Sequence, residues 1–284
     1  MPRAWNTDVR EPNKTLTVAI ILPARLKSTR LPDKLLLDRS GKTVLEHTIA
    51  QARKSLTRGF SARIVIAVDD ERLFAIARQC GAEAVMTDPN HTSGTDRVAE
   101  AALKINDEII VNLQADEPEI DPANIRIVAE LLTAAGERAP MATLAVPIFD
   151  ENTWKKPNVV KAVVSASGYA MYFSRAPLPY VRDANGNGNG ADEWTIEGRH
   201  VHGLHHLGIY AYRREFLLAY KRLPPSRLEQ LEKLEQLRAL EAGHAIKVGL
   251  VGSNPPGIDT LEDYEAFLIR EKNRNAATEM NQST

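Results

Sequence analysis

A near absence of cysteine is the first feature of this sequence, which has a single one, Cys80, in 284 residues. One cysteine cannot form an internal disulfide, so we expect a protein of a reducing compartment. Long hydrophobic runs are absent too. No apolar stretch approaches the length of a bilayer span, and the first residues lack the apolar segment of a signal peptide. These features predict a soluble, cytoplasmic protein without membrane insertion.

The sequence also lacks an excess of either charge. Its 36 Lys and Arg residues face 37 Asp and Glu residues, which leaves a net charge of −1. Nucleic-acid binding proteins usually carry a strong positive excess, so we expect no nucleic-acid partner. Residues 1–15 and 271–284 are polar, and we expect a flexible N-terminal extension and a flexible tail there. The remaining length suffices for one large α/β domain or two small ones.

Strand and helix patterns alternate in the first half of the chain. Short apolar, β-branched runs predict strands at residues 18–22, 63–68, 83–86 and 108–113. Between them, capping residues and apolar periodicity predict helices at residues 44–56, 71–80 and 96–105. The first helix should begin after Thr43 and bury Val44, Leu45, Thr48, Ile49 and Ala52. This rhythm predicts a doubly wound, mostly parallel sheet.

A cluster of positive charge directly follows the first strand. Ten positions contain Arg25, Lys27, Ser28, Thr29, Arg30 and Lys34. Pro23 and Pro32 restrict the backbone at both ends, which favours a held loop over a helix. An open α/β sheet binds anions at the carboxyl ends of its strands, so the loop predicts a polyphosphate site. From the loop alone, a solvated basic segment is an equal alternative.

Two later loops carry polar residues at the same end of the predicted sheet. Ser93, Gly94 and Thr95 open the helix at 96–105, where free N–H groups suit a nucleotide; a simple helix cap is the alternative. Asp116 and Glu117 follow the strand at 108–113. Acids in this place commonly hold Mg²⁺ for phosphate chemistry, and the alternative is a strand-end turn before Pro118.

The second half has a different pattern, which predicts a smaller mixed-sheet lobe. Strands are expected at residues 141–147, 161–164, 169–174, 205–212 and 247–251, and helices at residues 213–223, 228–240 and 261–270. The helix at 228–240 should turn Leu228, Leu231, Leu234 and Leu237 inward and Glu229, Glu232, Glu235 and Gln236 outward. The repeated Asn-Gly segment at residues 185–190 predicts a flexible loop.

Seven motifs occur in a fixed order along this framework. They are Pro-Ala-Arg-x-x-Ser-Thr-Arg-Leu-Pro-x-Lys (23–34), Ser-Gly-Thr-Asp-Arg (93–97), Asn-x-Gln-x-Asp-Glu-Pro (112–118), Tyr-Phe-Ser-Arg (172–175), His-Leu-Gly-Ile-Tyr (206–210), Leu-Glu-Gln-Leu-Arg (234–238) and Asp-Thr-x-Glu-Asp (259–263). In this order the chain resembles the 3-deoxy-D-manno-octulosonate (Kdo) cytidylyltransferases from about residue 16 to residue 270.

The resemblance implies a Rossmann-like nucleotidyltransferase fold in one domain over residues 16–270. Its nucleotide-binding half would span about 16–140 and its sugar-binding and dimerisation half about 141–250. It also implies a homodimer and a Mg²⁺-dependent reaction of CTP with Kdo, which gives CMP-Kdo and pyrophosphate for lipopolysaccharide or other surface polysaccharide.

The resemblance also implies roles for individual residues. Arg25, Ser28, Arg30 and Lys34 would hold the CTP triphosphate, and Ser93, Gly94 and Thr95 would belong to the cytidine pocket. Asp116 and Asp259 would hold Mg²⁺, and Arg25, Lys34 and Asp116 would act in catalysis. The sugar acid would contact Gln114, Arg175, His206, Tyr210, Glu235 and Gln236.

The sequence departs from the family pattern at several positions. Asp33 and Ala115 replace usual glycines, Tyr180 stands where tryptophan is common, and the loop at 185–203 looks longer than typical. These changes leave open an amino-substituted octulosonate such as 8-amino-Kdo, or another sugar acid, as the substrate. A non-catalytic nucleotide-binding module is a further alternative, which two retained metal carboxylates argue against.

Overall fold

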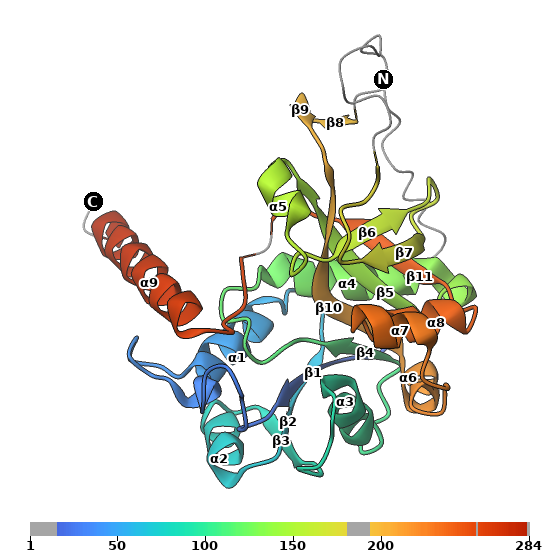
Figure 1. Cartoon of the computed structure of the whole chain (residues 1–284). Coiled ribbons are helices and arrows are strands. Elements are labelled where there is room, and N and C mark those ends of the chain that lie inside the picture. The colour runs from blue at the N-terminus through green and yellow to red at the C-terminus, as the bar shows by residue number, and fades with distance from the viewer. Residues whose placement is uncertain (1–15, 181–193, 254, 283–284) are drawn as a thin grey trace. The chain divides into compact units, whose positions relative to one another are not determined.

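The computed structural model describes residues 16–180, 194–253 and 255–282 (Figure 1). The chain consists of two compact units. The N-terminal unit consists of residues 17–126 together with the C-terminal segment from residue 255. The central unit runs from residue 127 to residue 253. The division therefore falls inside helix α4 (Pro122–Ala135) rather than near residue 140, and the last helix belongs with the first half of the chain. The predicted N-terminal extension and the Asn-Gly loop lie outside the described residues.

The N-terminal unit is built on a parallel sheet in the strand order β4-β1-β2-β3. Its strands are β1 (Val18–Ala24), β2 (Arg63–Val68), β3 (Glu83–Met86) and β4 (Ile109–Asn112). All residues of β1 are buried, because β1 pairs with β2 on one side and β4 on the other. Strands covered on both faces by crossover helices need continuous apolar runs. The predicted parallel α/β sheet is thus confirmed.

Side-chain caps begin the helices of this unit. Helix α1 (Val44–Lys54) has a capping box, in which Thr43 and Glu46 each bond the other's backbone N–H, and it buries the predicted face. Asp70 accepts a hydrogen bond from Arg72 N at the start of α2 (Glu71–Gln79). Ser93 does the same for Asp96 N at the start of α3 (Gly94–Ala102). Helices α1 and α2 begin where the sequence predicts, and α3 begins at Gly94, two residues before the predicted start at 96. A cap bonds a backbone N–H two or three positions away, so the cap residue fixes the first turn.

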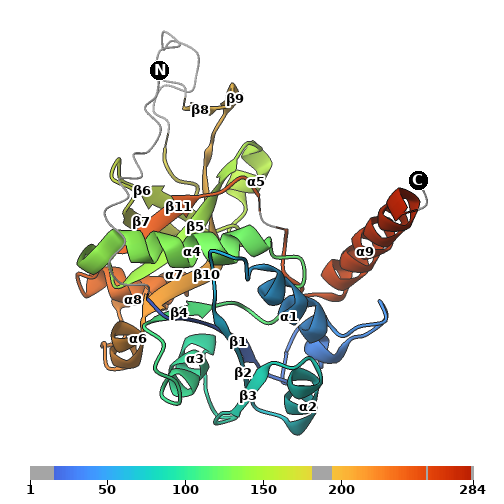
Figure 2. The same cartoon turned by 180° about the vertical axis from the view of Figure 1, so that it is seen from behind.

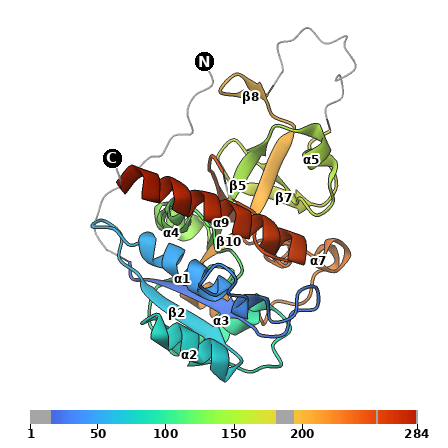
Figure 3. The same ribbon diagram turned by 90° about the vertical axis from the view of Figure 1, so that its left-hand side faces the viewer.

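Helix α9 (Leu261–Gln282) is longer than the sequence predicts. It lies beside α1 (Figure 3), and the rings of His47 in α1 and Phe267 in α9 meet edge to face with their centroids 5.1 Å apart. Further along, Arg270 and Arg274 bind the buried carboxylate of Glu119 at 2.6 and 2.7 Å. The predicted end at Arg270 is therefore wrong. Residues 271–282, for which we expected a flexible tail, are helical. Glu119 pairs with Arg270, at the predicted end, and with Arg274, beyond it.

The central unit has a mixed sheet, as the sequence predicts. Its strands are β5 (Met141–Ile148), β6 (Lys161–Val164), β7 (Ala170–Ser174), β10 (Gly203–Arg213) and β11 (Ile246–Leu250). Strand β11 is parallel to β5, whereas β10, β6 and β7 follow in antiparallel pairs. Helix α4 lies along this sheet (Figure 2). Its Leu131 packs against the backbone of Gly249 in β11, and a Cβ on Gly249 would lie 3.0 Å from Leu131 Cδ2.

Short elements complete the two units. They are η1 (Lys34–Leu36), η2 (Gly136–Arg138), α5 (Glu151–Lys155), the hairpin of β8 (Thr195–Ile196) and β9 (Arg199–His200), and α6 (Arg214–Tyr220). None of the described helices is both long and apolar enough to span a bilayer.

The predicted helix at 228–240 is wrong, because the structure has two helices there. Helix α7 (Arg227–Glu232) ends at Lys233, whose φ of 53° is left-handed, and α8 (Gln236–Glu241) starts afresh. The carbonyls of Glu232 and Lys233 accept hydrogen bonds from the Arg175 guanidinium instead of continuing the helix. The break reverses two predicted orientations: Leu231 is 69% exposed, and Gln236 is only 4% exposed.

Candidate active site

The basic loop begins at the carboxyl end of β1 and is attached to the core at its far end. Leu31 and Leu35 are buried, and Asp33 adopts a left-handed φ of 52° just before η1. Arg25 and Arg30 are exposed, and Ser28 is half-buried. The loop is therefore held by apolar anchors while its guanidinium groups remain accessible, which agrees better with a binding loop than with a loose solvated segment.

Lys34 brings the two predicted metal carboxylates together. Its Nζ donates to Asp116 Oδ2, to Asp259 Oδ1 at 3.1 Å and to the carbonyl of Ile258 at 2.9 Å. Arg30 also contacts Asp259 Oδ1, at 2.8 Å. Although the two acids lie far apart in the sequence, both reach a single ammonium group. This places four charged side chains of the predicted site in one cluster.

Close backbone contact makes that convergence possible. The N–H of Ile258 donates to the carbonyl of Asp116 at 2.8 Å. A Cβ on Gly257 would lie 3.3 Å from the same carbonyl and 3.3 Å from Glu117 Cγ, so a larger residue would crowd the segment away. Glycine at 257 thus allows the chain before α9 to lie directly against the end of β4.

The start of α3 lies next to the ends of β1 and β4. A Cβ on Gly94 would lie 3.5 Å from Pro23 Cγ and 3.7 Å from Gln114 Oε1. Ser93, Gly94 and Thr95 are partly exposed there, and Gln114 is half-buried. Ser93 caps the helix, as the alternative interpretation held. The position of this turn beside Gln114 is also compatible with nucleotide binding.

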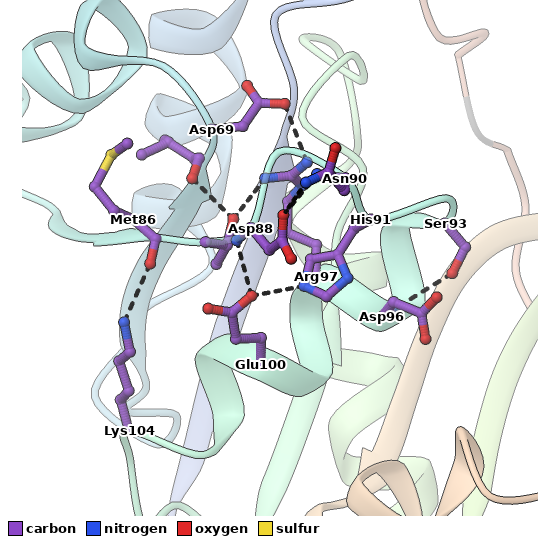
Figure 4. Close-up of polar contacts among 12 residues, drawn as sticks. Asp69, Met86, Asp88, Asn90, His91, Ser93, Asp96, Arg97, Glu100 and Lys104 are labelled. Atoms are coloured by element: carbon purple, nitrogen blue, oxygen red, sulfur yellow. Dashed lines mark hydrogen bonds and ion pairs between the residues drawn. The ribbon is translucent and has the colours of Figure 1, made fainter.

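A buried ion pair, which the sequence did not reveal, connects α3 with β2. Arg97 of α3 binds Asp69 Oδ2 at 3.0 Å (Figure 4). Asp69 Oδ1 accepts a hydrogen bond from Leu26 N in the basic loop at 2.9 Å. Nearby, His91 Nε2 lies 2.6 Å from Glu100 Oε2. From the sequence, the Asp69-Asp70 pair after the second strand is interpreted as a helix cap, with an approach to the base as the alternative. In the structure, only Asp70 caps α2. The arginine that ends the Ser-Gly-Thr-Asp-Arg motif was the available clue.

In the central unit, His206 and Tyr210 lie side by side on β10. Their rings are 5.4 Å apart, and His206 also meets Phe173 edge to face at 4.8 Å. Burial, reinforced by the neighbouring His205, lowers the pKa of His206 to about 3. Burial also raises the pKa of Tyr210 well above its usual value, with Tyr220 and Glu235 contributing. Both side chains are therefore neutral near pH 7.

Thr143 of β5 contacts the backbone and side chain of the β10 segment that carries His206 and Tyr210. The register between β5 and β10 shifts after Leu207 and resumes at Tyr210. Thr143 Oγ1 lies within 3.1 Å of the carbonyls of Leu207 and Ile209 and of His206 Nε2. One hydroxyl thus contacts both sides of the irregular Leu-Gly-Ile segment and fixes the spacing between the two candidate side chains.

Arg175 and the two residues at the start of α8 form the rest of the sugar-site prediction. The Arg175 guanidinium donates to the carbonyls of Glu232, Pro157 and Lys233. Glu232 in turn accepts from Ser174 Oγ and Arg175 N, a role that the sequence did not indicate. Glu235 is exposed, whereas Gln236 is buried, and its Nε2 has no hydrogen-bond partner among the described residues. The surface-facing alternative for Gln236 is therefore wrong.

Comparisons with known proteins agree with the motifs. A family model described as cytidylyltransferase matches residues 19–246. The 3-deoxy-manno-octulosonate cytidylyltransferase of Rhodopirellula baltica is 48% identical over 88% of this chain and 97% of its own, and that of Vibrio cholerae is 45% identical over 88% and 96%. The chain belongs to this cytidylyltransferase family.

Solved structures support the same family. A CMP:2-keto-3-deoxy-manno-octonic acid synthetase complexed with CTP is 38% identical, with a TM-score of 0.78, and the match covers 91% of this chain and 99% of that one. A cytidylyltransferase from Leptospira borgpetersenii is 17% identical with a TM-score of 0.56 over 93% and 96%, which shows the shared fold alone.

This member of the cytidylyltransferase family accommodates its departures from the pattern in different ways. Asp33 occupies a left-handed position of the kind that glycine usually fills. Ala115 is buried, and its carbonyl accepts a hydrogen bond from Thr48 Oγ1 at 2.9 Å, so a methyl group fits there. Tyr180 is 81% exposed. Residues 185–193 of the long loop lie outside the described residues, and its remaining part contains the β8–β9 hairpin.

Proposed function

We propose that this protein is a CTP-dependent enzyme that activates 3-deoxy-D-manno-octulosonate, with CMP-Kdo and pyrophosphate as products. The observation that carries this proposal is the convergence of Asp116, Asp259 and Lys34 beside the basic loop, in a chain of the Kdo cytidylyltransferase family. A module that only bound nucleotide would not need two carboxylates next to its phosphate-binding cations. The proposal therefore favours catalysis over regulation.

The reaction joins the anomeric oxygen of Kdo to the α-phosphorus of CTP. As that P–O bond forms, the bond from the α-phosphorus to the oxygen bridging to the β-phosphate breaks, pyrophosphate leaves, and the hydroxyl proton is released. Arg25, Arg30 and Lys34, with Ser28, would hold the triphosphate and compensate the negative charge that collects on the leaving pyrophosphate. Ser93, Gly94 and Thr95 would contact the cytidine from the start of α3, and Gln114 would lie close to them.

Asp116 and Asp259 fit a Mg²⁺ ion, because both carboxylates reach one ammonium group and are partly exposed. Mg²⁺ prefers oxygen ligands and commonly takes one or two carboxylates together with substrate phosphates. When bound, the ion would draw charge from the phosphate oxygens and increase the nucleophilicity of the attacking oxygen. Lys34 would then need to exchange its carboxylate contacts for phosphate contacts, which keeps the charge of the cluster balanced.

The central unit offers neutral, buried donors and acceptors that suit a polyhydroxylated sugar. His206 and Tyr210 keep their neutral forms near pH 7 and can accept or donate hydrogen bonds without a net charge. The buried amide of Gln236 would be stabilised by a sugar oxygen, since a buried donor without a partner is costly. The Arg175 guanidinium has five N–H donors and uses three of them in its contacts with backbone carbonyls. The others can still donate to the sugar carboxylate. Glu235 would accept from a sugar hydroxyl.

We extend the proposal to the setting of the enzyme. A cytoplasmic homodimer that supplies CMP-Kdo for lipopolysaccharide or other surface polysaccharide is what the family resemblance implies. Size-exclusion chromatography with light scattering tests the dimer. An apparent mass near that of one chain would contradict it.

Pyrophosphate release tests the reaction itself. CTP, UTP, ATP and GTP are each combined with Kdo, 8-amino-Kdo and sialic acid, with and without Mg²⁺. We expect release with CTP, Kdo and Mg²⁺ only. Release from CTP with 8-amino-Kdo alone would keep the mechanism and change the substrate. No release from any combination, in protein shown to be folded by circular dichroism, would favour the binding-module alternative.

A further inference from the structure

We propose that Asp69 is a positioning residue for the nucleotide, because it fixes the basic loop and the start of α3 in register with each other. The inference rests on the proposed function for the identity of the ligand. Neither Asp69 nor Arg97 belongs to the residues that would contact CTP in that proposal. Asp69, Leu26, Thr87 and Arg97 all belong to the N-terminal unit.

The Asp69 carboxylate lies between two segments of the N-terminal unit. Asp69 is the first residue after β2, and its two oxygens have different partners. Oδ2 binds the Arg97 guanidinium at 3.0 Å (Figure 4). Oδ1 accepts a hydrogen bond from the N–H of Leu26 at 2.9 Å. One small side chain therefore connects the loop that follows β1 with helix α3.

Burial makes this connection stiff. The Asp69 side chain is 9% exposed and the Arg97 side chain is 2% exposed. A charge removed from water to this extent has to keep its partners, because losing one leaves the other buried and uncompensated. Charge-assisted hydrogen bonds of this kind are also shorter and stronger than neutral ones.

Arg97 is itself held on its other side. It donates to Thr87 Oγ1, and Thr87 is bound to the carbonyl of Val68 through its N–H at 2.9 Å and its hydroxyl at 2.8 Å. The guanidinium thus has a fixed place between the ends of β2 and β3. Helix α3 has little freedom to shift relative to these strands.

Both ends of this chain of contacts reach residues that would bind CTP. Leu26 directly follows Arg25, so fixing the Leu26 amide fixes the origin of the Arg25 side chain. Arg97 lies about one helical turn from Ser93, Gly94 and Thr95. The triphosphate and the cytidine belong to one molecule, and the enzyme has to hold its two binding segments at the matching separation. Asp69 sets that separation.

Asp69 has a second consequence for charge. Burial lowers the pKa of Arg97, with a smaller contribution from the Arg25 charge, whereas Asp69 and Glu100 raise it. Asp69 neutralises Arg97, which leaves the Arg25 charge available to an anion. Without the carboxylate, the buried Arg97 would compete for the same anion or push the loop away.

The test compares Asp69→Asn with Asp70→Asn. Asp70 is the adjacent acid, but it is partly exposed and only caps α2 through Arg72. Calorimetry on the full chain measures the dissociation constants of CTP, of cytidine and of pyrophosphate, all without the sugar acid. In Asp69→Asn we expect CTP binding to weaken about tenfold or more, the equivalent of one charged hydrogen bond. Cytidine and pyrophosphate, which each engage one segment only, should weaken by less than about threefold.

This fragment comparison separates positioning from plain damage to the site. Local unfolding would weaken all three ligands alike, and that result would overturn the proposal. It would also be overturned by unchanged CTP binding in Asp69→Asn, or by an equal loss in Asp70→Asn. If Asp69→Asn does not fold, Thr87→Val replaces it, since this change removes one of the contacts that hold Arg97. Thr87→Val should then weaken CTP more than either fragment, and equal losses for all three would overturn the proposal.

Kinetics provide the second readout. In Asp69→Asn, KM for CTP should rise while KM for the sugar acid stays within about twofold of wild type. A rise in the sugar KM as large as that for CTP would contradict a role in nucleotide register. Because the binding measurements need no turnover, a wild-type protein that binds CTP but releases no pyrophosphate would refute the proposed reaction and leave this inference testable.

Discussion

The candidate residues of the two units differ in charge and in exposure. In the N-terminal unit, Arg30 and Asp259 have side chains that are 64% and 47% exposed, and they meet in an ionic cluster with Lys34. In the central unit, His206 and Gln236 are 7% and 4% exposed and are neutral, whereas the candidates Arg175 and Glu235 carry ionisable groups and Glu235 is exposed. An ionic, accessible cluster suits a polyanion with its metal ion, because the ligand itself supplies the missing counter-charge. A buried, neutral set suits hydroxyl groups, which need directed hydrogen bonds. The contrast predicts different responses to mutation.

The largest effect should come from the carboxylates of the ionic cluster. Asp116→Asn or Asp259→Asn should lower kcat by about a thousandfold with Mg²⁺ present, since each removes one of two metal carboxylates. Folding should persist, because both side chains are partly exposed. Steady-state pyrophosphate release measures kcat, and a thermal melt checks folding. Glu262→Gln, an exposed acid close by in α9, is the matched control. A near-normal rate in either aspartate variant would remove that residue from the proposed metal site.

The next largest effect should follow from Arg175→Ala. The substitution removes a charged partner of the sugar carboxylate and also releases the carbonyls that divide α7 from α8. We expect KM for the sugar acid to rise by roughly 30-fold, with KM for CTP within about threefold. Arg227→Ala, on the exposed side of α7, serves as the control. A raised CTP KM with an unchanged sugar KM would show that Arg175 has been assigned to the wrong substrate.

Gln236→Leu should separate binding from stability. The sugar KM should rise about tenfold, because a buried amide that pairs with a hydroxyl is lost. The free enzyme should become more stable by about 1 kcal/mol, since the Nε2 without a partner is replaced by an apolar group. Chemical denaturation measures the free energy of unfolding, and Gln230→Leu on the exposed face of α7 is the comparison. A less stable variant with normal sugar binding would mean that the amide serves the fold.

The last prediction concerns the pH dependence of stability. Burial lowers the pKa of His206 from 6.5 in the unfolded chain to about 3, so below pH 6.5 the unfolded state binds a proton that the folded state does not. Stability from this group is complete above pH 6.5 and falls as the pH drops, by about 1.4 kcal/mol per pH unit until the folded pKa is reached. His206→Asn should therefore show a shallower loss of Tm between pH 6.5 and pH 4 than the wild type. Parallel curves would contradict the neutral, buried state of His206.

The starts of α1 and α2 were predictable from the sequence, whereas the ends of α7 and α9 were not. Thr43 with Glu46, and Asp70 with Arg72, mark the beginnings of α1 and α2 because their hydrogen bonds join residues two or three positions apart. The end of α7 depends on Arg175, which is distant in the sequence, and α9 extends past Arg270 beside the paired Glu119. Apolar periodicity therefore predicted one helix where tertiary hydrogen bonds produce two.

The sequence by itself determined the parallel sheet, the capped helices and the ordered motifs that identify the cytidylyltransferase family. Each of these depends on residues that are neighbours in the chain, on their apolar period or on their local hydrogen bonds. Only the tertiary structure decided that Lys34 joins Asp116 to Asp259, that Gln236 is buried, and that Asp69 faces Leu26 and Arg97 rather than a helix end. Those contacts join segments that are far apart in the sequence, and their geometry follows from the path of the whole chain, which local patterns do not contain.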